Sequence, residues 1–207
     1  MSHRAGLFVT LEGGEGVGKS TAAAGLAALL RAEGAEVVLT REPGGTAGAE
    51  AVRALLLGAI PLDALAQTML HFAARADHVA AVIRPALAAG KIVICDRFYD
   101  STMAYQGFGQ GVDVAAVASL IRLINLKPDV TFMLEAPDSV IETRLRARGG
   151  AADRYEALGM EFFARVAHGF RTIAASEPGR CAVIDAAGAP EAVASALRAT
   201  LRARTGR

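Results

Sequence analysis

Residues 13–20 read Gly-Gly-Glu-Gly-Val-Gly-Lys-Ser and complete the pattern G-x-x-x-x-G-K-[ST]. The apolar run 7–11 leads straight into this pattern, and an Ala/Leu-rich stretch, 21–30, follows it. The order predicts a strand, a glycine-rich turn and a helix, which is the context in which this pattern cradles phosphate groups. Backbone N–H groups and the positive end of the helix dipole then converge on one anion. The alternative is a chance glycine-rich turn, which the flanking strand and helix disfavour.

Two side chains of this loop carry further chemistry. Lys19 can reach the terminal phosphates as a point charge, and the Ser20 hydroxyl can hold Mg²⁺. The residues expected to surround the triphosphate are Gly13, Gly14, Glu15, Gly16, Val17, Gly18, Lys19, Ser20 and Thr21.

Four more short apolar runs follow, at 37–39, 92–95, 130–134 and 182–184, each separated from the next by a helix-like segment. Short, nearly all-apolar strands that alternate with helices are typical of a parallel sheet covered on both faces. The sequence therefore predicts an α/β fold, the three-layer sandwich of P-loop NTPases, with a five-stranded parallel sheet and helices on both faces. Its 207 residues fit a single domain.

Composition limits the possible partners. A net charge of +1 offers no field for gripping a nucleic-acid polymer. The positive mean hydropathy, +0.34, comes largely from alanine, and the apolar stretch 79–89 is far too short to span a membrane. Residues 1–4 leave no room for a signal peptide. Cys95 and Cys181 lie in apolar runs and are expected to be buried, reduced thiols, so we expect a cytoplasmic protein.

Charged residues follow the predicted strands, where the substrates of such folds bind. Asp96 and Arg97 come directly after the third strand. A carboxylate there can hold hydrated Mg²⁺ near Ser20, and the arginine fork suits a second phosphate; the alternative is a structural ion pair. Arg41, in the turn 40–46, is placed to reach an anion or to lie exposed on the surface, and both interpretations stay open.

A basic segment comes later in the chain. Between about 145 and 156, arginines bracket Gly149-Gly150-Ala151-Ala152. Such a segment suits a lid that closes cations over a transferring phosphoryl group. The alternative is a basic loop exposed to solvent, which is the more common fate of such segments. The lid becomes a competing interpretation only because the chain also carries a phosphate loop. The arginines concerned are Arg144, Arg146, Arg148 and Arg154.

Aromatic and polar residues at helical spacing offer a place for a base. His71, Phe72 and Arg75 lie in one helix-like stretch, and Thr102 and Gln106 are four apart in another. Together, the ring, the guanidinium, the hydroxyl and the amide could stack on a nucleotide base and hydrogen-bond to its edge. Alternatively, Phe72 is a core residue, and Thr102 and Gln106 lie on a solvated helix face.

Taken together, these pieces resemble the thymidylate kinase family over nearly the whole chain. The phosphate loop is shared by many families, whereas Arg-Glu-Pro-Gly-Gly-Thr at 41–46 and Ala-Tyr-Gln-Gly at 104–107 are far more specific. Phe-Ala-Ala-Arg at 72–75, Asp96-Arg97 and Lys-Pro-Asp at 127–129 fit as well.

The resemblance implies transfer of the γ-phosphoryl group of ATP to dTMP, which gives dTDP, in a Mg²⁺-dependent homodimer. By position it implies that Arg97 and Arg41 hold the acceptor phosphate and that Glu15 approaches the sugar 3′-hydroxyl and the phosphate. Arg53 resembles an arginine that the family places near the acceptor. Lys19, Glu15 and Arg97 are the catalytic candidates in the core of the site.

The resemblance also implies how the base is read. Arg75 would donate to thymine O4; cytosine carries an amino donor at that position and would leave the arginine unpaired. Thr102 and Gln106 would read the remaining base edge, and Tyr105 would crowd a ribose 2′-hydroxyl.

The chain departs from the family pattern at one position. The family's base-stacking phenylalanine lies four residues before the arginine, and here His71 takes that place, with Phe72 one residue later. Either could meet the base, and His71 is slightly favoured. The loop also lacks the arginine that some members carry, so the chain resembles the subgroup whose catalytic arginines come from the lid. This favours Arg148 and Arg154.

Two other functions compete with this interpretation. One is a kinase for another small acceptor. The other is a regulatory GTP-binding switch, because Asn-Leu-Lys-Pro-Asp at 125–129 partly matches a guanine-reading motif, although it precedes a strand instead of following one.

Overall fold

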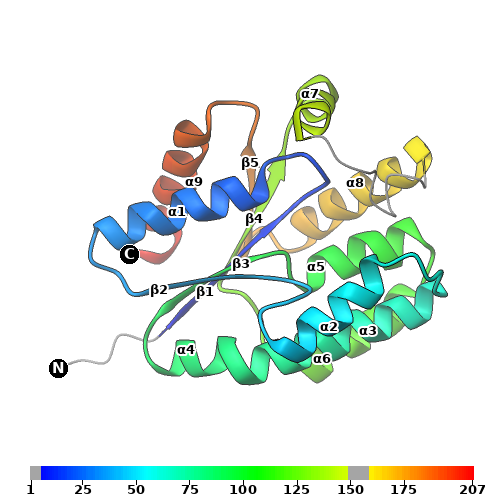
Figure 1. Cartoon of the computed structure of the whole chain (residues 1–207). Helices are drawn as coiled ribbons and strands as arrows, with labels where there is room; N and C mark the ends of the chain where they lie inside the picture. Colours follow the sequence, from blue (N-terminus) through cyan, green and yellow to red (C-terminus); the bar gives the residue numbers. More distant parts are fainter. Residues whose placement is uncertain (1–5, 149–158) are drawn as a thin grey trace.

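The computed structural model describes residues 6–148 and 159–207, apart from the side chain of Arg148 (Figure 1). The five predicted strands are confirmed, and each is one or two residues longer than its apolar run. Each of them ends on a charged residue at the carboxyl edge of the sheet. The strands are β1 (Leu7–Glu12), β2 (Val37–Arg41), β3 (Ile92–Asp96), β4 (Val130–Glu135) and β5 (Cys181–Asp185).

The strands form one parallel sheet in the order β2-β3-β1-β4-β5. β1 lies in the middle, with Leu11 opposite Asp96 of β3 and Glu12 opposite Met133 of β4. Because all five strands run the same way, their charged carboxyl ends meet at one edge. The predicted five-stranded parallel sheet is thus confirmed.

Helices connect the strands, and the segments η1 and η2 are π-helical. Among the described residues, none of the helices is long and apolar enough to cross a membrane. The helical elements are α1 (Lys19–Ala32), α2 (Ala47–Leu57), α3 (Ala64–His78), η1 (Val79–Ile83), α4 (Arg84–Ala88), α5 (Tyr99–Thr102), η2 (Met103–Gly109), α6 (Val114–Ile124), α7 (Asp138–Arg148), α8 (Gly159–Ser176) and α9 (Pro190–Thr205).

Both faces of the sheet are covered, as predicted. Alternate residues of a strand point to opposite faces, and β1 shows this clearly. Leu7, Val9 and Leu11 pack with α1 and α9 in one core cluster, whereas Phe8 packs with α3, η1, α4 and α6 in another. Helix α8 extends the second layer over β4 and β5. Figure 1 shows α1 and α9 on one side of the sheet and α3, α4 and α6 on the other.

The Lys-Pro-Asp segment before β4 has a structural role. The Asp129 carboxylate accepts a hydrogen bond of 2.7 Å from the backbone N–H of Phe8. The backbone N–H of Asp129 in turn donates to the Phe8 carbonyl at 2.8 Å. This two-way contact fixes the register of β1 against β4, and so the position of the loop that follows β1.

Candidate active site

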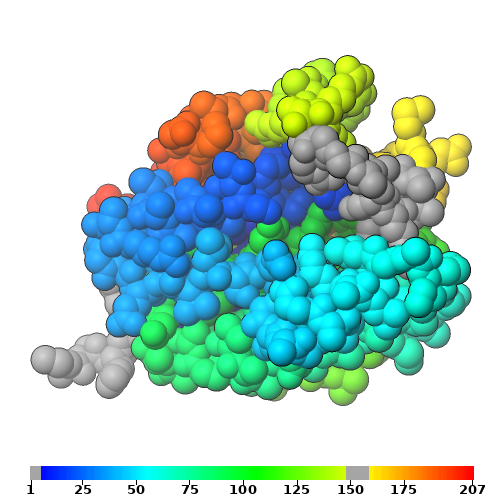
Figure 2. All heavy atoms as spheres, in the orientation of Figure 1, coloured from blue at the N-terminus to red at the C-terminus, as the bar shows by residue number. Residues whose placement is uncertain are grey.

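A cavity of about 650 Å³ opens at the carboxyl edge of the sheet. In Figure 2 the surface is hollowed between the blue segment that carries the glycine-rich loop and the cyan segment of α2 and α3. Most of the side chains predicted for the site come together here. The predicted residues that line it are Glu15, Gly16, Val17, Gly18, Lys19, Ser20, Thr21, Arg41, Arg53, His71, Arg75, Asp96, Arg97, Thr102, Tyr105 and Gln106.

The glycine-rich loop joins β1 to α1 as predicted. Gly13 has φ 137°, and a Cβ there would lie 2.5 Å from the Leu134 carbonyl oxygen, so only glycine fits. Gly18 precedes α1 and has no side chain to cap the helix, which leaves the first N–H groups for an anion. The loop therefore has the geometry of an anion-binding turn.

Lys19 folds back over this loop. Its Nζ donates to the Gly14 carbonyl at 2.6 Å, and its side chain is buried. Burial, followed by the nearby charge of Arg97, lowers its pKa to about 8. A buried, poorly compensated ammonium is poised to bind an anionic ligand.

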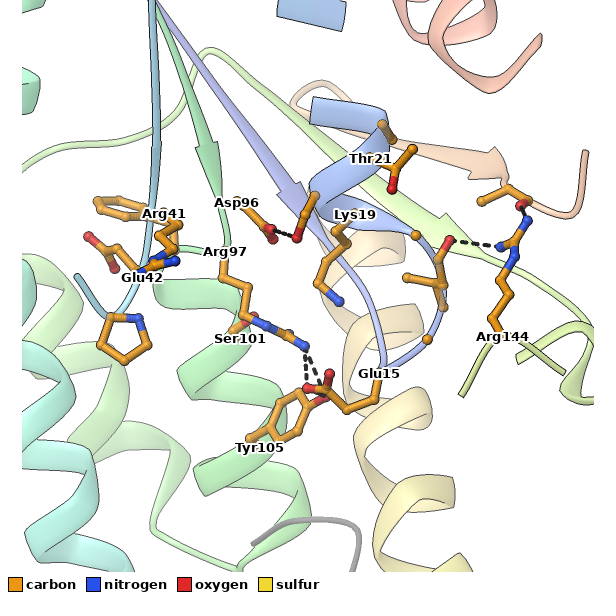
Figure 3. A pocket seen from close by; sticks show the side chains of 18 of the residues that line it. Glu15, Lys19, Thr21, Arg41, Glu42, Asp96, Arg97, Ser101, Tyr105 and Arg144 are labelled. Atoms are coloured by element: carbon orange, nitrogen blue, oxygen red, sulfur yellow. Dashed lines mark hydrogen bonds and ion pairs between the residues drawn. The ribbon is translucent and has the colours of Figure 1, made fainter. Parts of the chain in front are cut away.

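Ser20 and Asp96 meet at the mouth of the cavity. The Ser20 hydroxyl donates to the Asp96 carboxylate at 2.5 Å (Figure 3). Hydroxyl and carboxylate oxygens beside a phosphate-binding loop are the hard donors that Mg²⁺ prefers. The residues present therefore fit a magnesium ion.

Arg97 occupies the centre of the cavity. Its backbone is left-handed, with φ 69°, and its guanidinium lies close to the glycine-rich loop. One nitrogen donates to the Gly13 carbonyl at 3.0 Å and to the Ser101 hydroxyl at 2.9 Å, and the other pairs with Glu15 at 2.6 Å. The Tyr105 hydroxyl donates to the same carboxylate at 3.2 Å. Glu15 and Arg97 thus form one connected pair, drawn in Figure 3.

Glu12 is a buried acid that the sequence analysis did not identify. It accepts hydrogen bonds from the Phe98 backbone N–H at 2.7 Å and from the Ser101 hydroxyl at 2.5 Å. Burial, followed by the charge of Asp100, raises its pKa above the ordinary range. A charged residue at the end of an otherwise apolar strand was the signal that could have revealed it.

Arg75 is buried on the side of the cavity formed by α3 and the turn after β2. Its Nε donates to Glu42 at 2.7 Å, and its Nη2 donates to the Thr102 hydroxyl at 3.1 Å. Its Nη1 is also buried, and within the described part of the chain it has no hydrogen-bond partner. The arginine therefore has one buried N–H donor that is available to a ligand.

His71 and Phe72 have different surroundings. His71 lines the cavity, and its Nε2 is buried with no hydrogen-bond partner among the described residues. Burial, and then the charge of Arg75, lowers its pKa to about 3, so the ring is neutral. Phe72 is only 5% exposed and packs in the core with Phe98, 4.7 Å beneath the Arg75 guanidinium. It is not among the described residues that line the cavity.

Two more arginines reach the cavity from the β2 side. Arg41 is exposed and pairs with Glu50 at 3.1 Å. Arg53, half-buried on α2, donates to the Pro43 carbonyl at 2.9 Å. Both face the same opening as Arg97.

Arg144 on α7 bridges two parts of the site, although the sequence analysis grouped it only with the basic segment. One of its nitrogens donates to the Val17 carbonyl at 3.2 Å, and another to the Ala186 carbonyl at 2.9 Å. It thereby joins the glycine-rich loop to the turn after β5. The predicted lid is described only in part, since residues 149–158, with Arg154, and the side chain of Arg148 lie outside the described residues.

Comparison with known proteins gives a consistent result. The family model for thymidylate kinase matches residues 11–197. A thymidylate kinase from Gluconobacter oxydans is 53% identical over 197 residues, which cover 93% of this chain and 92% of that protein. One from Chromohalobacter salexigens is 50% identical over 96% of both. The crystal structure of thymidylate kinase from Ehrlichia chaffeensis superposes with a TM-score of 0.80 at 38% identity, covering 95% of this chain and 99% of that one.

Proposed function

Because the chain belongs to the thymidylate kinase family and transfers the γ-phosphoryl group of ATP to dTMP to give dTDP, we propose how its residues divide that work. The observation that carries the proposal is the pairing of a glycine-rich phosphate loop at one end of the cavity with the buried, partly unsatisfied Arg75 at the other. One end suits a triphosphate, and the other suits a base.

The glycine-rich loop binds the phosphates of ATP in this proposal. Mg²⁺ is held by the Ser20 hydroxyl and the Asp96 carboxylate, which supply oxygen donors 2.5 Å apart. When bound, the ion neutralises phosphate charge. Lys19 contributes a second positive charge from within the loop.

The acceptor phosphate lies among Arg97, Arg41 and Arg53. Transfer is direct and in line, because phosphoryl transfer depends on positioning and charge neutralisation and needs no covalent intermediate. Glu15 approaches the sugar 3′-hydroxyl, and its pairing with Arg97 at 2.6 Å supports a shared role in orienting the acceptor. Tyr105, bonded to the same carboxylate, crowds a ribose 2′-hydroxyl.

The base is recognised by the buried polar groups at the other end of the cavity. Arg75 donates through Nη1 to thymine O4, and a cytosine amino group would leave that donor unpaired. Thr102 and Gln106 read the remaining edge. His71 stacks on the ring, a role supported by its place on the cavity wall, whereas Phe72 packs beneath Arg75.

Two groups of residues act on the ATP side. Arg144 bridges the glycine-rich loop and the 186–188 turn, so we place it against the adenosine part of ATP. Arg148 and Arg154 supply lid charges to the transition state. This assignment rests on the sequence: the loop itself carries no arginine. Arg154→Ala should lower kcat more than it weakens ATP binding.

The active form is a homodimer in this proposal. Leu65 and Met69 lie four residues apart on α3 and are 47% and 57% exposed, and Leu123 on the neighbouring α6 is 79% exposed. Exposed apolar side chains on adjoining helices suit an interface. Light scattering should give twice the chain mass, and Met69→Glu should reduce it to one.

We place the enzyme in the cytoplasm. Cys95 and Cys181 are both free and buried, which suits a reducing compartment. Cell fractionation with a tagged chain tests this directly.

An acceptor panel tests the proposed base reading. ATP consumption is measured with dTMP, dUMP, dCMP, dGMP and the ribonucleotide of thymine. We expect dTMP to be the best acceptor, dCMP to be rejected most strongly among the pyrimidines, and the ribonucleotide to be poorer than dTMP. Equal use of dCMP and dTMP would contradict the role given to Arg75.

A further inference from the structure

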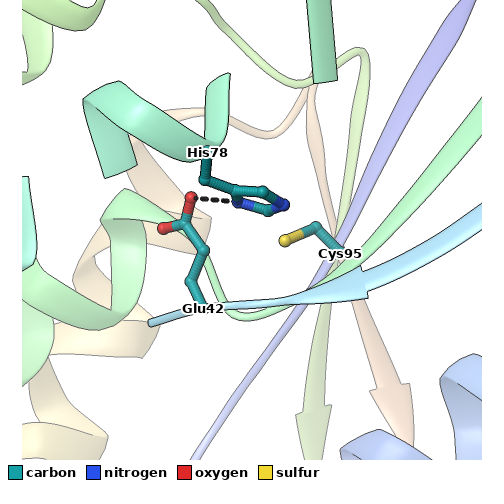
Figure 4. A group of neighbouring side chains, drawn as sticks. All are labelled: Glu42, His78 and Cys95. Atoms are coloured by element: carbon teal, nitrogen blue, oxygen red, sulfur yellow. Dashed lines mark hydrogen bonds and ion pairs between the residues drawn. The ribbon is translucent and has the colours of Figure 1, made fainter. Parts of the chain in front are cut away.

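A buried cluster of Glu42, His78 and Cys95 (Figure 4) adjoins Arg75 through Glu42. Glu42 follows β2, His78 ends α3, and Cys95 lies in β3. Their ligand atoms all lie within 4.8 Å of one another, and a carboxylate, an imidazole and a thiol form a donor set suited to zinc. The cluster therefore invites two interpretations, a metal site or a hydrogen-bonded support.

The hydrogen bonds argue against a metal site. Both oxygens of Glu42 are engaged, one by Arg75 at 2.7 Å and the other by His78 Nδ1 at 3.0 Å. The Cys95 thiol donates to the Arg97 carbonyl at 3.0 Å, and burial, then the charge of Glu42, raises its pKa well above the ordinary value. A protonated thiol is a poor ligand.

The same bonds define a single chain of donors and acceptors. The ionised carboxylate of Glu42 only accepts, so His78 Nδ1 carries the proton and donates to it. On the other side of the ring, Nε2 bonds to the Thr40 hydroxyl, 2.7 Å away. Arg75 donates its Nε to the other oxygen of Glu42 and its Nη2 to Thr102. The Nη1 of Arg75 lies at the end of this series of hydrogen bonds and has no partner of its own among the described residues.

We propose that His78 is a positioning residue for base recognition: it holds Glu42, and Glu42 in turn holds the Arg75 guanidinium so that Nη1 faces the base. This inference rests on the role given to Arg75 in the proposed function. His78 itself is fully buried and is not among the described residues that line the cavity, so it acts through Glu42.

The turn after β2 is built around His78. Gly45 has φ 90°, and a Cβ there would lie 2.5 Å from the imidazole of His78 and 2.9 Å from the Thr40 hydroxyl. The next residue, Thr46, donates its hydroxyl to Asp77, the neighbour of His78 on α3. The Gly-Gly-Thr part of the motif thereby fits closely over His78 and fixes its ring.

Two substitutions of His78 separate the bonds that it makes. In His78→Asn the amide nitrogen can take the place of Nδ1 and keep the donation to Glu42. In His78→Gln the longer amide takes the place of Nε2, which keeps the contact with Thr40 and leaves Glu42 without that donor. The two variants are both amides, so they make a matched pair.

The experiment measures kcat and KM for dTMP and for dCMP in both variants and in Arg75→Ala. In His78→Gln the preference for dTMP over dCMP should fall at least about tenfold through the KM for dTMP, because a hydrogen bond to a charged group is lost. The KM for ATP should stay within about twofold, and His78→Asn should restore most of the preference.

Each other result overturns the inference. If Arg75→Ala loses the preference while His78→Gln keeps it, the positioning role is wrong and the role of Arg75 stands. If Arg75→Ala keeps the preference, the role of Arg75 falls and this inference with it. Equal losses in both His78 variants would indicate only a structural role.

A milder variant decides the matter if His78→Gln does not fold. Thr40→Val removes one hydroxyl, at the far end of the chain of bonds, with little change of shape. We expect it to lower the preference for dTMP by about threefold, since a neutral hydrogen bond is lost. An unchanged preference in a folded Thr40→Val protein would contradict the inference.

Discussion

The Ser20 hydroxyl donates to the Asp96 carboxylate at 2.5 Å, although the two residues are 76 positions apart in the chain. Ser20 lies in the first turn of α1, and Asp96 ends β3, the strand that pairs directly with β1. The parallel pairing places the two oxygens beside the glycine-rich loop. This contact is where we place Mg²⁺.

Asp96→Asn tests this magnesium site. The amide keeps the shape of the carboxylate but loses its charge and one acceptor, so binding of a divalent cation should weaken. We expect the Mg²⁺ concentration for half-maximal rate to rise and kcat/KM to fall by about 100-fold. Titration of activity with Mg²⁺ measures this. Glu36→Gln, at an exposed carboxylate paired with Lys91, is the matched control and should behave as the wild type.

Lys19 should take up a proton when ATP binds. Its pKa is lowered to about 8 by burial and by Arg97, so near pH 9 the free protein holds this amine largely neutral. A bound triphosphate favours the charged form and raises the pKa again. Calorimetry in two buffers of different ionisation enthalpy should therefore show uptake of up to one proton. Lys19→Arg, whose guanidinium does not titrate there, should show none; equal uptake in that variant would locate the proton elsewhere.

The sequence predicted the strands well, because five short apolar runs have few alternatives to buried parallel strands. It also predicted that the charged residues after those runs would meet, since parallel strands end at one edge. Glu12 was missed because its place before the glycine-rich loop does not show that its carboxylate is buried against Phe98 and Ser101. Glu42 and His78 lie 36 positions apart, and their pairing depends on how α3 packs against β2, which local sequence patterns do not encode.

His71 and Phe72, which are neighbours in one helix, show the same limit of prediction from the sequence. Successive residues of a helix differ by about 100° in direction, so one of the two faces the cavity and the other the core. Both are aromatic, so the pattern left both open and favoured His71 only slightly. The packing of α3 against Phe98 and β1 makes the choice: Phe72 belongs to the core cluster, and His71 lines the cavity.

Substitution of His71 tests the stacking role. His71→Ala should raise the KM for dTMP by about tenfold, because base–aromatic stacking is lost. His71→Phe should keep it near the wild-type value. Phe72→Leu is the control: it should lower the melting temperature through poorer core packing while changing the KM for dTMP less than His71→Ala does. The opposite ranking would assign the stacking role to Phe72.

His71 also makes stability depend on pH. Its pKa is about 3 in the folded protein and 6.5 when unperturbed, so between these values the unfolded chain binds more protons. The free energy of unfolding must therefore fall as the pH drops from 6.5 toward 3. In His71→Phe this contribution is absent. Urea titrations at several pH values should show a smaller loss in that variant; identical slopes would mean that His71 is not buried as described.

Arg144 provides the last test, because Arg146 two residues later is a natural control. Arg144 lines the cavity and bridges Val17 and Ala186, whereas Arg146 is exposed and pairs with Glu142 one turn away on the same helix. Arg144→Ala should raise the KM for ATP by about tenfold, since charged hydrogen bonds that order the loop are lost. The KM for dTMP should change little, because the dTMP end of the cavity is built by other elements. Arg146→Ala should match the wild type in both constants. A rise in the KM for dTMP alone would move Arg144 away from the ATP side.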